Sequence, residues 1–360
     1  MSTQGAVSLE ELEGNPHPVL ARLRQREPVA WVPALNAWLI TSRELALAAM
    51  RDPGTFTVDD PRFSTGRVVG RSMLTTEGEE HDRHRRPFAA MFRKAEVQAS
   101  LADVVATETD RLLDAIEPAG RGDLRRAVAA PLAARIVTHA LGVPAERALD
   151  WYAAIVHATT ELSRGAEEVT REARAPVAEL RASVPDSETA SDVATLMFGG
   201  IETTEGMIAN ALLHLLDHPD ELARVREDPA LTANAIEESL RLEPAAATID
   251  RYAARDTVFG DASISQGDLV TISITAANRD PATFEDPDRF DVTRANAKLH
   301  LAFAHGPHVC IGMHLARLEA HTAVSRVLER LPNLGLDPER REPPRGLVFR
   351  KPDSLHARWG

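Results

Sequence analysis

The stretch Phe303-Ala304-His305-Gly306-Pro307-His308-Val309-Cys310-Ile311-Gly312 contains the only cysteine of the 360-residue chain. Its Gly, Pro and His residues predict a loop, and the residues that follow predict an amphipathic helix. A cysteine at the start of a helix gains from the positive end of the helix dipole and from unpaired backbone N–H groups. Both effects favour the thiolate form of Cys310.

The loop admits three interpretations when it is considered alone. Cys310 can be a small buried side chain without a chemical role, which is common for a single cysteine. It can join His300, His305 and His308 in a zinc site, although His305 and His308 lie too close to Cys310 along the chain to converge readily on a tetrahedral ion. It can also be a thiolate ligand to a haem iron.

The overall composition is that of a globular protein, with 44% hydrophobic and 26% charged residues. The apolar stretches are interrupted too often to form a membrane span of about 20 residues. With 41 basic and 54 acidic residues the formal charge is −13, which argues against a broad attraction to nucleic acid or to anionic membrane. Residues 1–15 resemble neither a signal peptide nor an anchor, and a single cysteine cannot form a disulfide within the chain. We therefore expect a soluble, cytoplasmic protein.

Hydrophobic periodicity predicts a mainly helical chain with a smaller β part. A helix over His17 to Arg26 precedes a β-like run from Pro28 to Thr41, and residues 97–235 carry only helical patterns. Strand signals return at 249–275, and the last helix runs from about 311 to 331. We expect one domain over residues 1–360, with a helical body at about 76–245 and 311–331 and a β-rich part at about 15–60, 249–275 and 345–360.

The loop from Phe303 to Gly312 resembles the haem-binding signature of the cytochrome P450 superfamily, soluble bacterial type. That signature reads Phe, a small residue, any residue, Gly, any, His or Arg, any, Cys, any, Gly, and Ala304 stands where Gly is usual. The resemblance implies a triangular helical domain with a small β-rich N-terminal subdomain. It also implies that Cys310 ligates the iron of haem b, that His308 contacts a haem propionate, and that Phe303 and Gly312 belong to the haem-binding loop.

The apolar segment from Val193 to Leu216 is interrupted by Gly199-Gly200-Ile201-Glu202-Thr203-Thr204. These glycines and polar residues predict either a helix with one solvated edge or a kink at an active site. The segment is similar to the oxygen-binding helix of the cytochrome P450 superfamily. That similarity implies that Glu202 and Thr203 are an acid–alcohol pair, which relays protons to dioxygen.

Two further motifs occur in the order that the superfamily has. Glu238 and Arg241 are three residues apart on one helix face, and alone they would be a weak surface pair. They resemble the Glu-x-x-Arg element, which implies that Arg289 in Pro287-Asp288-Arg289-Phe290 completes a buried cluster that supports the cysteine loop. His81 and Arg85 share a helix face suited to an anion, although the face could also be solvated. By resemblance they bind propionates together with Arg251.

The resemblance also implies partners and a reaction. The chain would be a monooxygenase that takes dioxygen and a lipophilic small molecule, works as a monomer and receives electrons from a separate ferredoxin with its reductase. The rival functions are a haem-thiolate peroxygenase or coupling enzyme and a haem sensor without catalysis, and the pair of Glu202 and Thr203 speaks against a peroxide user. Leu180 to Glu188 leads almost directly into the oxygen-binding helix, so we expect a chain shortened there.

Residues that the resemblance assigns to the surroundings of the site form three sets. A basic docking face for the electron donor would include Arg83, Arg86, Arg93, Lys94 and Arg317. Walls of the substrate pocket would include Phe56–Leu74, Ile155–Arg164, Thr195, Phe198, Gly199, Ala245–Thr248 and Lys351–Asp353. Polar anchors for the substrate would be Arg67, Arg71, Glu161 and Arg164.

Overall fold

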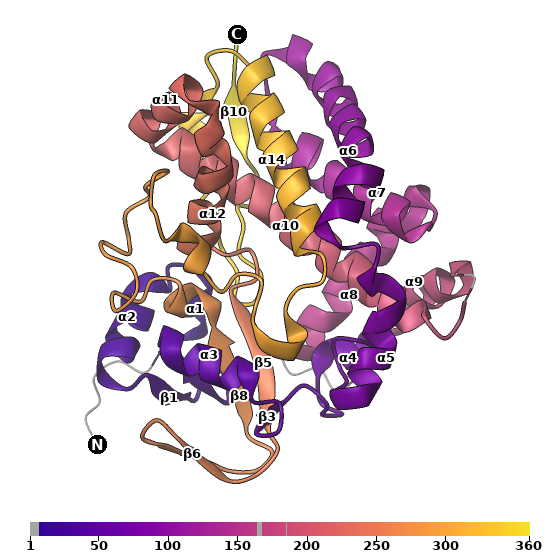
Figure 1. The fold of residues 1–360 in the computed structure, drawn as a ribbon, viewed down its shortest axis with the longest axis vertical. Coiled ribbons are helices and arrows are strands. Elements are labelled where there is room, and N and C mark those ends of the chain that lie inside the picture. The colour runs from indigo at the N-terminus through magenta and orange to yellow at the C-terminus, as the bar shows by residue number, and fades with distance from the viewer. Residues whose placement is uncertain (1–6, 164–167, 185) are drawn as a thin grey trace.

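The structure of the protein is a computed structural model that describes residues 7–163, 168–184 and 186–360. The α-helices are α1 (Leu9–Glu13), α2 (His17–Arg26), α3 (Arg43–Arg51), α4 (Ser64–Val69), α5 (Gly78–Ala89), α6 (Lys94–Ile116), α7 (Ala130–Leu141), α8 (Ala148–Ser163), α9 (Arg171–Ser183), α10 (Ala190–Asp217), α11 (Pro219–Glu227), α12 (Thr232–Leu242), α13 (Ile274–Ala277) and α14 (Met313–Arg330). The strands are β1 (Val29–Val32), β2 (Ala37–Ile40), β3 (Phe56–Thr57), β4 (Arg121–Asp123), β5 (Thr248–Ala253), β6 (Thr257–Phe259), β7 (Ala262–Ile264), β8 (Leu269–Ser273), β9 (Gly335–Leu336) and β10 (His356–Arg358). Most helices gather on one side of the molecule, and the largest sheet lies on the other (Figure 1).

The five-stranded sheet has the order β1-β2-β8-β5-β3. Its β2 and β8 run parallel, with Leu39 opposite Thr271, while the other neighbours are antiparallel. Because side chains alternate between the two faces of a strand, Ile40 packs with α3 and Leu39 packs with α1 and α2. Helices therefore cover both faces of the sheet.

The long helix α10 lies at the centre of the helical part, in contact with α7, α8, α9, α12 and α14 (Figure 1). Its sequence is apolar on nearly all sides, which is typical of a helix surrounded by protein. A Cβ at Gly200 would lie 2.9 Å from Cγ2 of Val137 in α7, so the helices cross closely there. A Cβ at Gly199 would meet no atom within 4 Å, because this residue borders a cavity.

The predicted fold class is confirmed, and several elements begin and end where the sequence placed them. Helix α2 covers the predicted His17–Arg26, and α9 ends only a few residues before α10 begins. Strand β4 was missed because three residues carry no periodicity, and it forms only by pairing with β10 near the C-terminus. Among the described helices, not even the longest has the apolar length needed to cross a membrane.

The contrast between the two adjacent glycines of α10 can be tested by substitution. Gly200→Ala should lower the free energy of unfolding by about 1–3 kcal/mol, because its methyl group overlaps the stiff side chain of Val137. Gly199→Ala should raise it by up to about 1 kcal/mol, through helix propensity alone. Equilibrium unfolding in urea measures both, and equal effects of the two substitutions would contradict the packing of α7 on α10.

Candidate active site

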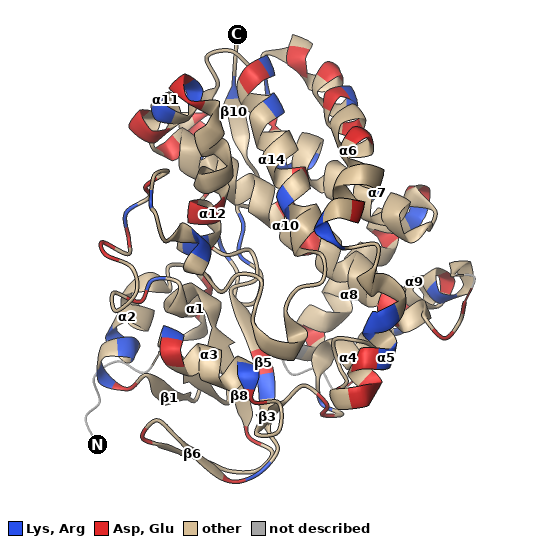
Figure 2. Cartoon of the chain, in the orientation of Figure 1, with Lys and Arg blue, Asp and Glu red and all other residues tan. Residues whose placement is uncertain are grey.

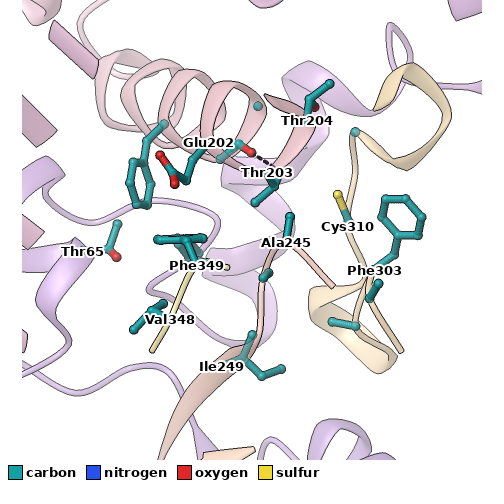
Figure 3. Close-up of a pocket in the computed structure, with 18 of the residues that line it drawn as sticks. Thr65, Glu202, Thr203, Thr204, Ala245, Ile249, Phe303, Cys310, Val348 and Phe349 are labelled. Carbon is teal, nitrogen blue, oxygen red and sulfur yellow. Dashed lines mark hydrogen bonds between the residues drawn. The ribbon is translucent and has the colours of Figure 1, made fainter. Parts of the chain in front are cut away.

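The loop before α14 has a backbone that fixes the position of Cys310. Gly306 has φ +75°, and a Cβ there would collide with the carbonyl of Met50 in α3, so only glycine fits where the loop crosses α3. Ala304 has φ +55°, a conformation that costs a non-glycine residue about 1 kcal/mol. The N–H of Cys310 donates to the carbonyl of Phe303 at 2.9 Å and closes the loop. Figure 3 shows Cys310 beside the cavity that α10 borders.

The thiol of Cys310 experiences opposing influences. Burial is the largest of them and raises its pKa, while the N–H groups of Gly312 and Met313 at the start of α14 lower it. Arg85 and Arg317 act in the same direction as these N–H groups. The helix start therefore favours the thiolate as the sequence predicted, but burial keeps the free thiol protonated until a cation replaces the proton. The accessible surface of Cys310 faces the cavity.

The cavity has a volume of about 680 Å³, in the range of sites for cofactors and small ligands. Each predicted wall segment from residue 63 onward contributes to its lining, which includes Phe63, Ser64, Thr65, Met73, Leu74, Val156, Thr159, Thr160, Thr195, Phe198, Gly199, Ala245, Ala246, Thr248, Lys351 and Asp353. Of the predicted polar anchors, Arg67, Arg71 and Glu161 do not line it, and Arg164 lies outside the described residues. Arg71 instead binds Asp59 and Glu80 at the surface, so the wall is mainly apolar with threonine hydroxyls.

Basic side chains gather around one carboxylate beside the cavity. The rings of His81 and His308 have centroids 4.5 Å apart, and Nε2 of His308 lies 2.9 Å from Oε2 of Glu77. Nε2 of His81 is buried without a hydrogen-bond partner, and burial together with His308 and Arg85 lowers the pKa of His81. Arg251 is only 5% exposed. Buried donors in excess of the available acceptors fit the two propionates of a haem.

Glu202 and Thr203 both line the cavity, on α10. The hydroxyl of Thr203 donates to the carbonyl of Gly199 at 2.5 Å, along the helix (Figure 3). Glu202 is 5% exposed, and its Oε1 lies 2.7 Å from Nζ of Lys351. Among the described contacts none joins the acid to the alcohol directly, so the two predicted partners share a wall and not a hydrogen bond.

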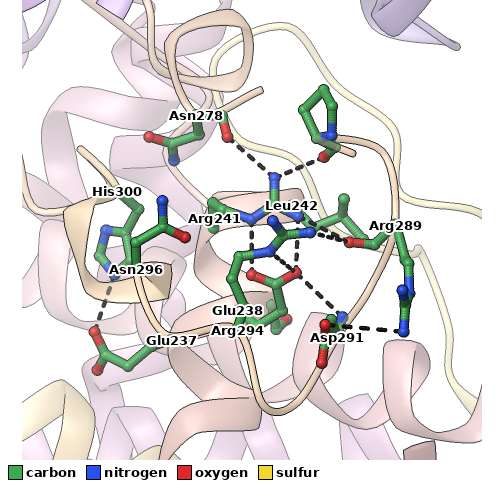
Figure 4. A network of polar contacts seen from close by, with 12 residues as sticks. Glu237, Glu238, Arg241, Leu242, Asn278, Arg289, Asp291, Arg294, Asn296 and His300 are labelled. Atoms are coloured by element: carbon green, nitrogen blue, oxygen red, sulfur yellow. Dashed lines mark hydrogen bonds and ion pairs between the residues drawn. The ribbon is translucent and has the colours of Figure 1, made fainter. Parts of the chain in front are cut away.

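Glu238 binds two guanidinium groups, and one of them is not the predicted one (Figure 4). Arg241 donates to both of its oxygens, at 2.7 and 2.8 Å, and both side chains are fully buried. The second cation is Arg294, with Nε 2.9 Å from Oε1 of Glu238. The prediction for Arg289 is wrong: its side chain is 61% exposed and lies 3.8 Å from Asp291. Its carbonyl points inward instead and accepts from Arg241 and Arg294, which turns the side chain toward solvent.

The neighbouring carboxylate, Glu237, holds the cysteine loop from another side. It accepts from Nε of Arg317 at 2.6 Å, while Nε2 of His300 lies 3.1 Å from its other oxygen. Burial acts to raise the pKa of Glu237, but these hydrogen bonds outweigh it and lower the pKa to about 2. Arg317 also lies over the ring of Phe303, 4.4 Å from its centroid. The charge of Arg317 is thus paired with Glu237. Contrary to the prediction, Arg317 does not add an unpaired charge to a basic face.

The sequence missed Glu205 and Arg125, which continue the polar wall behind Glu202, and it placed Lys351 in the wall without its contacts. Nζ of Lys351 lies 3.0 Å from Oε2 of Glu205, and Nε of Arg125 lies 2.6 Å from Oε1 of Glu205. Glu205 follows Glu202 by three residues, so helical spacing could have placed both on one face. Nothing in the local sequence links either glutamate to Lys351 or to Arg125.

The zinc interpretation finds no support in the described part of the chain. There, no three His, Cys, Asp or Glu side chains converge in a way that could hold a metal ion. His300 and His308 are each engaged by a glutamate. Nδ1 of His305 accepts from the N–H of Gly306 at the start of a short turn, and its Nε2 lies 3.4 Å from the guanidinium of Arg51.

Comparisons of the sequence and of the structure with known proteins both find cytochromes P450. The model of the family Cytochrome P450 matches residues 172–353. Cytochrome P450 107B1 of Saccharopolyspora erythraea is 36% identical over 88% of each chain. Mycinamicin VIII C21 methyl hydroxylase of Micromonospora griseorubida is 32% identical over 90% of this chain and 87% of its own. The crystal structure of P450BioI in complex with hexadec-9Z-enoic acid ligated acyl carrier protein superposes with a TM-score of 0.85 at 29% identity, over 98% of this chain and all of that one.

The two arginines near Glu238 can be distinguished by stability. Arg294→Met should lower the free energy of unfolding by about 3 kcal/mol, because it leaves part of a fully buried carboxylate charge without a partner. Arg289→Met should change it by less than about 0.5 kcal/mol, since an exposed side chain with a long contact is lost. Both values come from urea unfolding, and the reverse ranking would restore the original assignment of Arg289.

Proposed function

Because the chain belongs to the cytochrome P450 family, we propose that Cys310 is the axial ligand of its haem iron and that Glu202 and Thr203 supply protons to dioxygen. Membership makes the chain a haem-dependent monooxygenase, an oxidoreductase that inserts one atom of O2 into a substrate. The observation that carries the proposal is the sulfur of Cys310 on the wall of a cavity that Thr203 also lines.

The protein has groups suited to the iron of the haem and other groups suited to its propionates. Bound haem supplies an iron centre that activates dioxygen, and electron donation by a thiolate ligand favours cleavage of the O–O bond. The N–H groups of Gly312 and Met313 stabilise negative charge on the sulfur of Cys310. Arg85, Arg251, His81 and His308 would hold the propionates of the haem by charge-assisted hydrogen bonds.

Proton supply is the role we assign to the polar groups of α10. The hydroxyl of Thr203 rotates from the carbonyl of Gly199 toward the cavity and donates there. Glu202 returns the proton, either directly or through one water molecule, after its carboxylate leaves Lys351. General acid catalysis of this kind contributes about 10²- to 10⁴-fold to a rate.

The substrate that we propose is a lipophilic small molecule, as in secondary metabolism or catabolism. The mainly apolar lining with threonine hydroxyls supports this class. One relative is named for hydroxylating a methyl group of mycinamicin VIII, and the P450BioI structure contains a hexadecenoic acid on a carrier protein. Hexadecenoic acid has a long apolar chain, which agrees with this class.

We propose a separate ferredoxin as the electron donor. We also propose that the enzyme is a monomer in the cytoplasm, where the reducing environment keeps Cys310 as a free thiol. Four exposed basic residues on α5 and at the start of α6 support the docking surface: Arg83, Arg86, Arg93 and Lys94. Arg85 on the same helix donates to the carbonyl of Val309, next to Cys310, so this surface is close to the ligand. Acidic residues are mixed with basic ones on α5 as on the other helices, because Glu79, Glu80 and Asp82 precede the arginines there (Figure 2).

Replacing the ligand tests the proposal directly. The purified protein, reduced with dithionite under carbon monoxide, should show a Soret band at the red-shifted position of a thiolate–CO complex. Cys310→Ser should abolish that band because a hydroxyl is a poor ligand for this iron. The control His305→Ala should keep it, and a protein that binds zinc in place of haem would overturn the assignment.

Charge reversal tests the donor surface. Arg83→Glu with Arg93→Glu should slow reduction by a ferredoxin about tenfold at low salt, and the difference should shrink as salt screens the charges. Arg121→Glu with Arg340→Glu, near the sheet of β10 and far from α5 (Figure 1), is the control of equal charge. Stopped-flow reduction under carbon monoxide gives the rates, and equal rates in both double variants would exclude this surface.

A further inference from the structure

Behind Glu202 lies a chain of four alternating charges. Nζ of Lys351 bridges Oε1 of Glu202 at 2.7 Å and Oε2 of Glu205 at 3.0 Å, and Nε of Arg125 lies 2.6 Å from the other oxygen of Glu205. Glu202 and Glu205 are 5% and 2% exposed. Two buried carboxylates thus face two cations, and the cluster is electrically balanced.

The cluster is oriented with respect to the cavity. Glu202 and Lys351 line the cavity, whereas Glu205 and Arg125 lie behind them. Taking such charges out of water costs free energy that an apolar replacement would not cost. Stability alone therefore does not explain why a lysine reaches the acid of the oxygen-activating wall.

The backbone that carries Lys351 is held from two sides. Asn210 of α10 donates to the carbonyl of Arg350 at 2.9 Å, and the N–H of Arg350 donates to the carbonyl of Ala245 at the same distance. The guanidinium of Arg350 binds Glu243 at 2.7 Å and carbonyls of the N-terminal segment. The backbone of Lys351 is thus fixed relative to α10, and its Nζ is held by Glu202 and Glu205, which allows it to orient the carboxylate of Glu202.

We propose that Lys351 is a positioning residue for Glu202, and that Glu205 and Arg125 make its contact with Glu202 reversible. The inference rests on the proposed function, because it specifies how Glu202 takes part in proton transfer. In the observed arrangement Lys351 holds the carboxylate of Glu202 away from Thr203. When Glu202 turns toward the cavity, Lys351 keeps Glu205 and Glu205 keeps Arg125, so no buried cation is left without a partner.

Reduction of O2 at this site consumes protons whether or not a substrate is present. A substrate R–H, one O2, two electrons from the ferredoxin and two protons from solvent give R–OH and one water. Without substrate, O2 is reduced either to hydrogen peroxide with two electrons and two protons or to two waters with four of each. Glu202 passes protons and recovers them from solvent, and Lys351 returns it to the same starting position after each transfer.

The experiment compares Lys351→Met, Lys351→Arg, Glu205→Gln and Glu202→Gln in the haem-loaded protein. NADPH, a plant ferredoxin and its reductase drive O2 consumption without added substrate, in H2O and in D2O. Lys351→Met should lower the rate about tenfold and increase the solvent isotope effect, because proton delivery becomes limiting. Lys351→Arg should restore most of the rate, since a guanidinium can also bridge two carboxylates. Glu205→Gln should give a smaller loss in the same direction.

A double-mutant cycle shows whether Lys351 acts through Glu202. In the Glu202→Gln background, Lys351→Met should change the rate by less than twofold. The same tenfold loss in that background, or an unchanged rate and isotope effect in the single variant, would overturn the proposal. Arg341→Met, which removes the surface ion pair with Asp217, is the matched control and should behave as wild type.

Three measurements distinguish a failure of this inference from a failure of the proposed function on which it rests. A wild-type protein that binds no haem or consumes no O2 rejects the proposed function itself. Reduction under carbon monoxide should be equal in wild type and Lys351→Met, and slower reduction of the variant would assign Lys351 to electron transfer instead. If Lys351→Met does not fold, Glu205→Gln carries the test with Lys351→Arg as its near-wild-type control, and a wild-type rate and isotope effect in Glu205→Gln would reject the proposal.

Discussion

The cysteine loop depends on the fully buried ion pair between the carboxylate of Glu238 and the guanidinium of Arg241. Arg241 binds it and uses its remaining N–H groups for the carbonyls of Asn278, Pro287 and Arg289. The side-chain oxygen of Asn278 in turn accepts from the N–H of Leu301, just before the loop. A single ion pair on α12 thus orders an irregular segment that has no helix or strand to hold it. Breaking such a pair is costly because an unpaired charge remains in the interior.

This support gives the cavity two chemically different parts. Where α5, β5 and the cysteine loop meet, Arg85, Arg251 and His308 provide hydrogen-bond donors suited to anionic groups. The part enclosed by α8, α10 and the segment before β10 is mainly apolar, with threonine hydroxyls and the ion pair of Glu202 and Lys351. This asymmetry would orient a planar cofactor with two carboxylates at one edge and would leave the apolar part for the molecule to be oxidised.

The sequence predicted those features whose residues are close along the chain. The loop around Cys310, the position of Glu202 and Thr203 on one cavity wall and the bounds of α2 each follow from one short stretch. Arg294 was missed because it lies in a segment without periodicity, where the direction of a side chain depends on turns such as the one at Asp286, with φ +43°. The contact of Lys351 with Glu205 joins residues 146 positions apart, and no local pattern reports such a contact.

The pairing of β2 with β8 also sets the order in which the chain can fold. Leu39 pairs with Thr271, which lies far along the chain. The β2 edge of the hairpin of β1 and β2 therefore stays unpaired until the central helices and β8 have been synthesised. An unpaired edge is a template for wrong strand contacts. Until residues 269–273 are present to form β8, the free edge of β2 can therefore pair with other strands, so the long separation of the two strands in the chain is a source of misfolding.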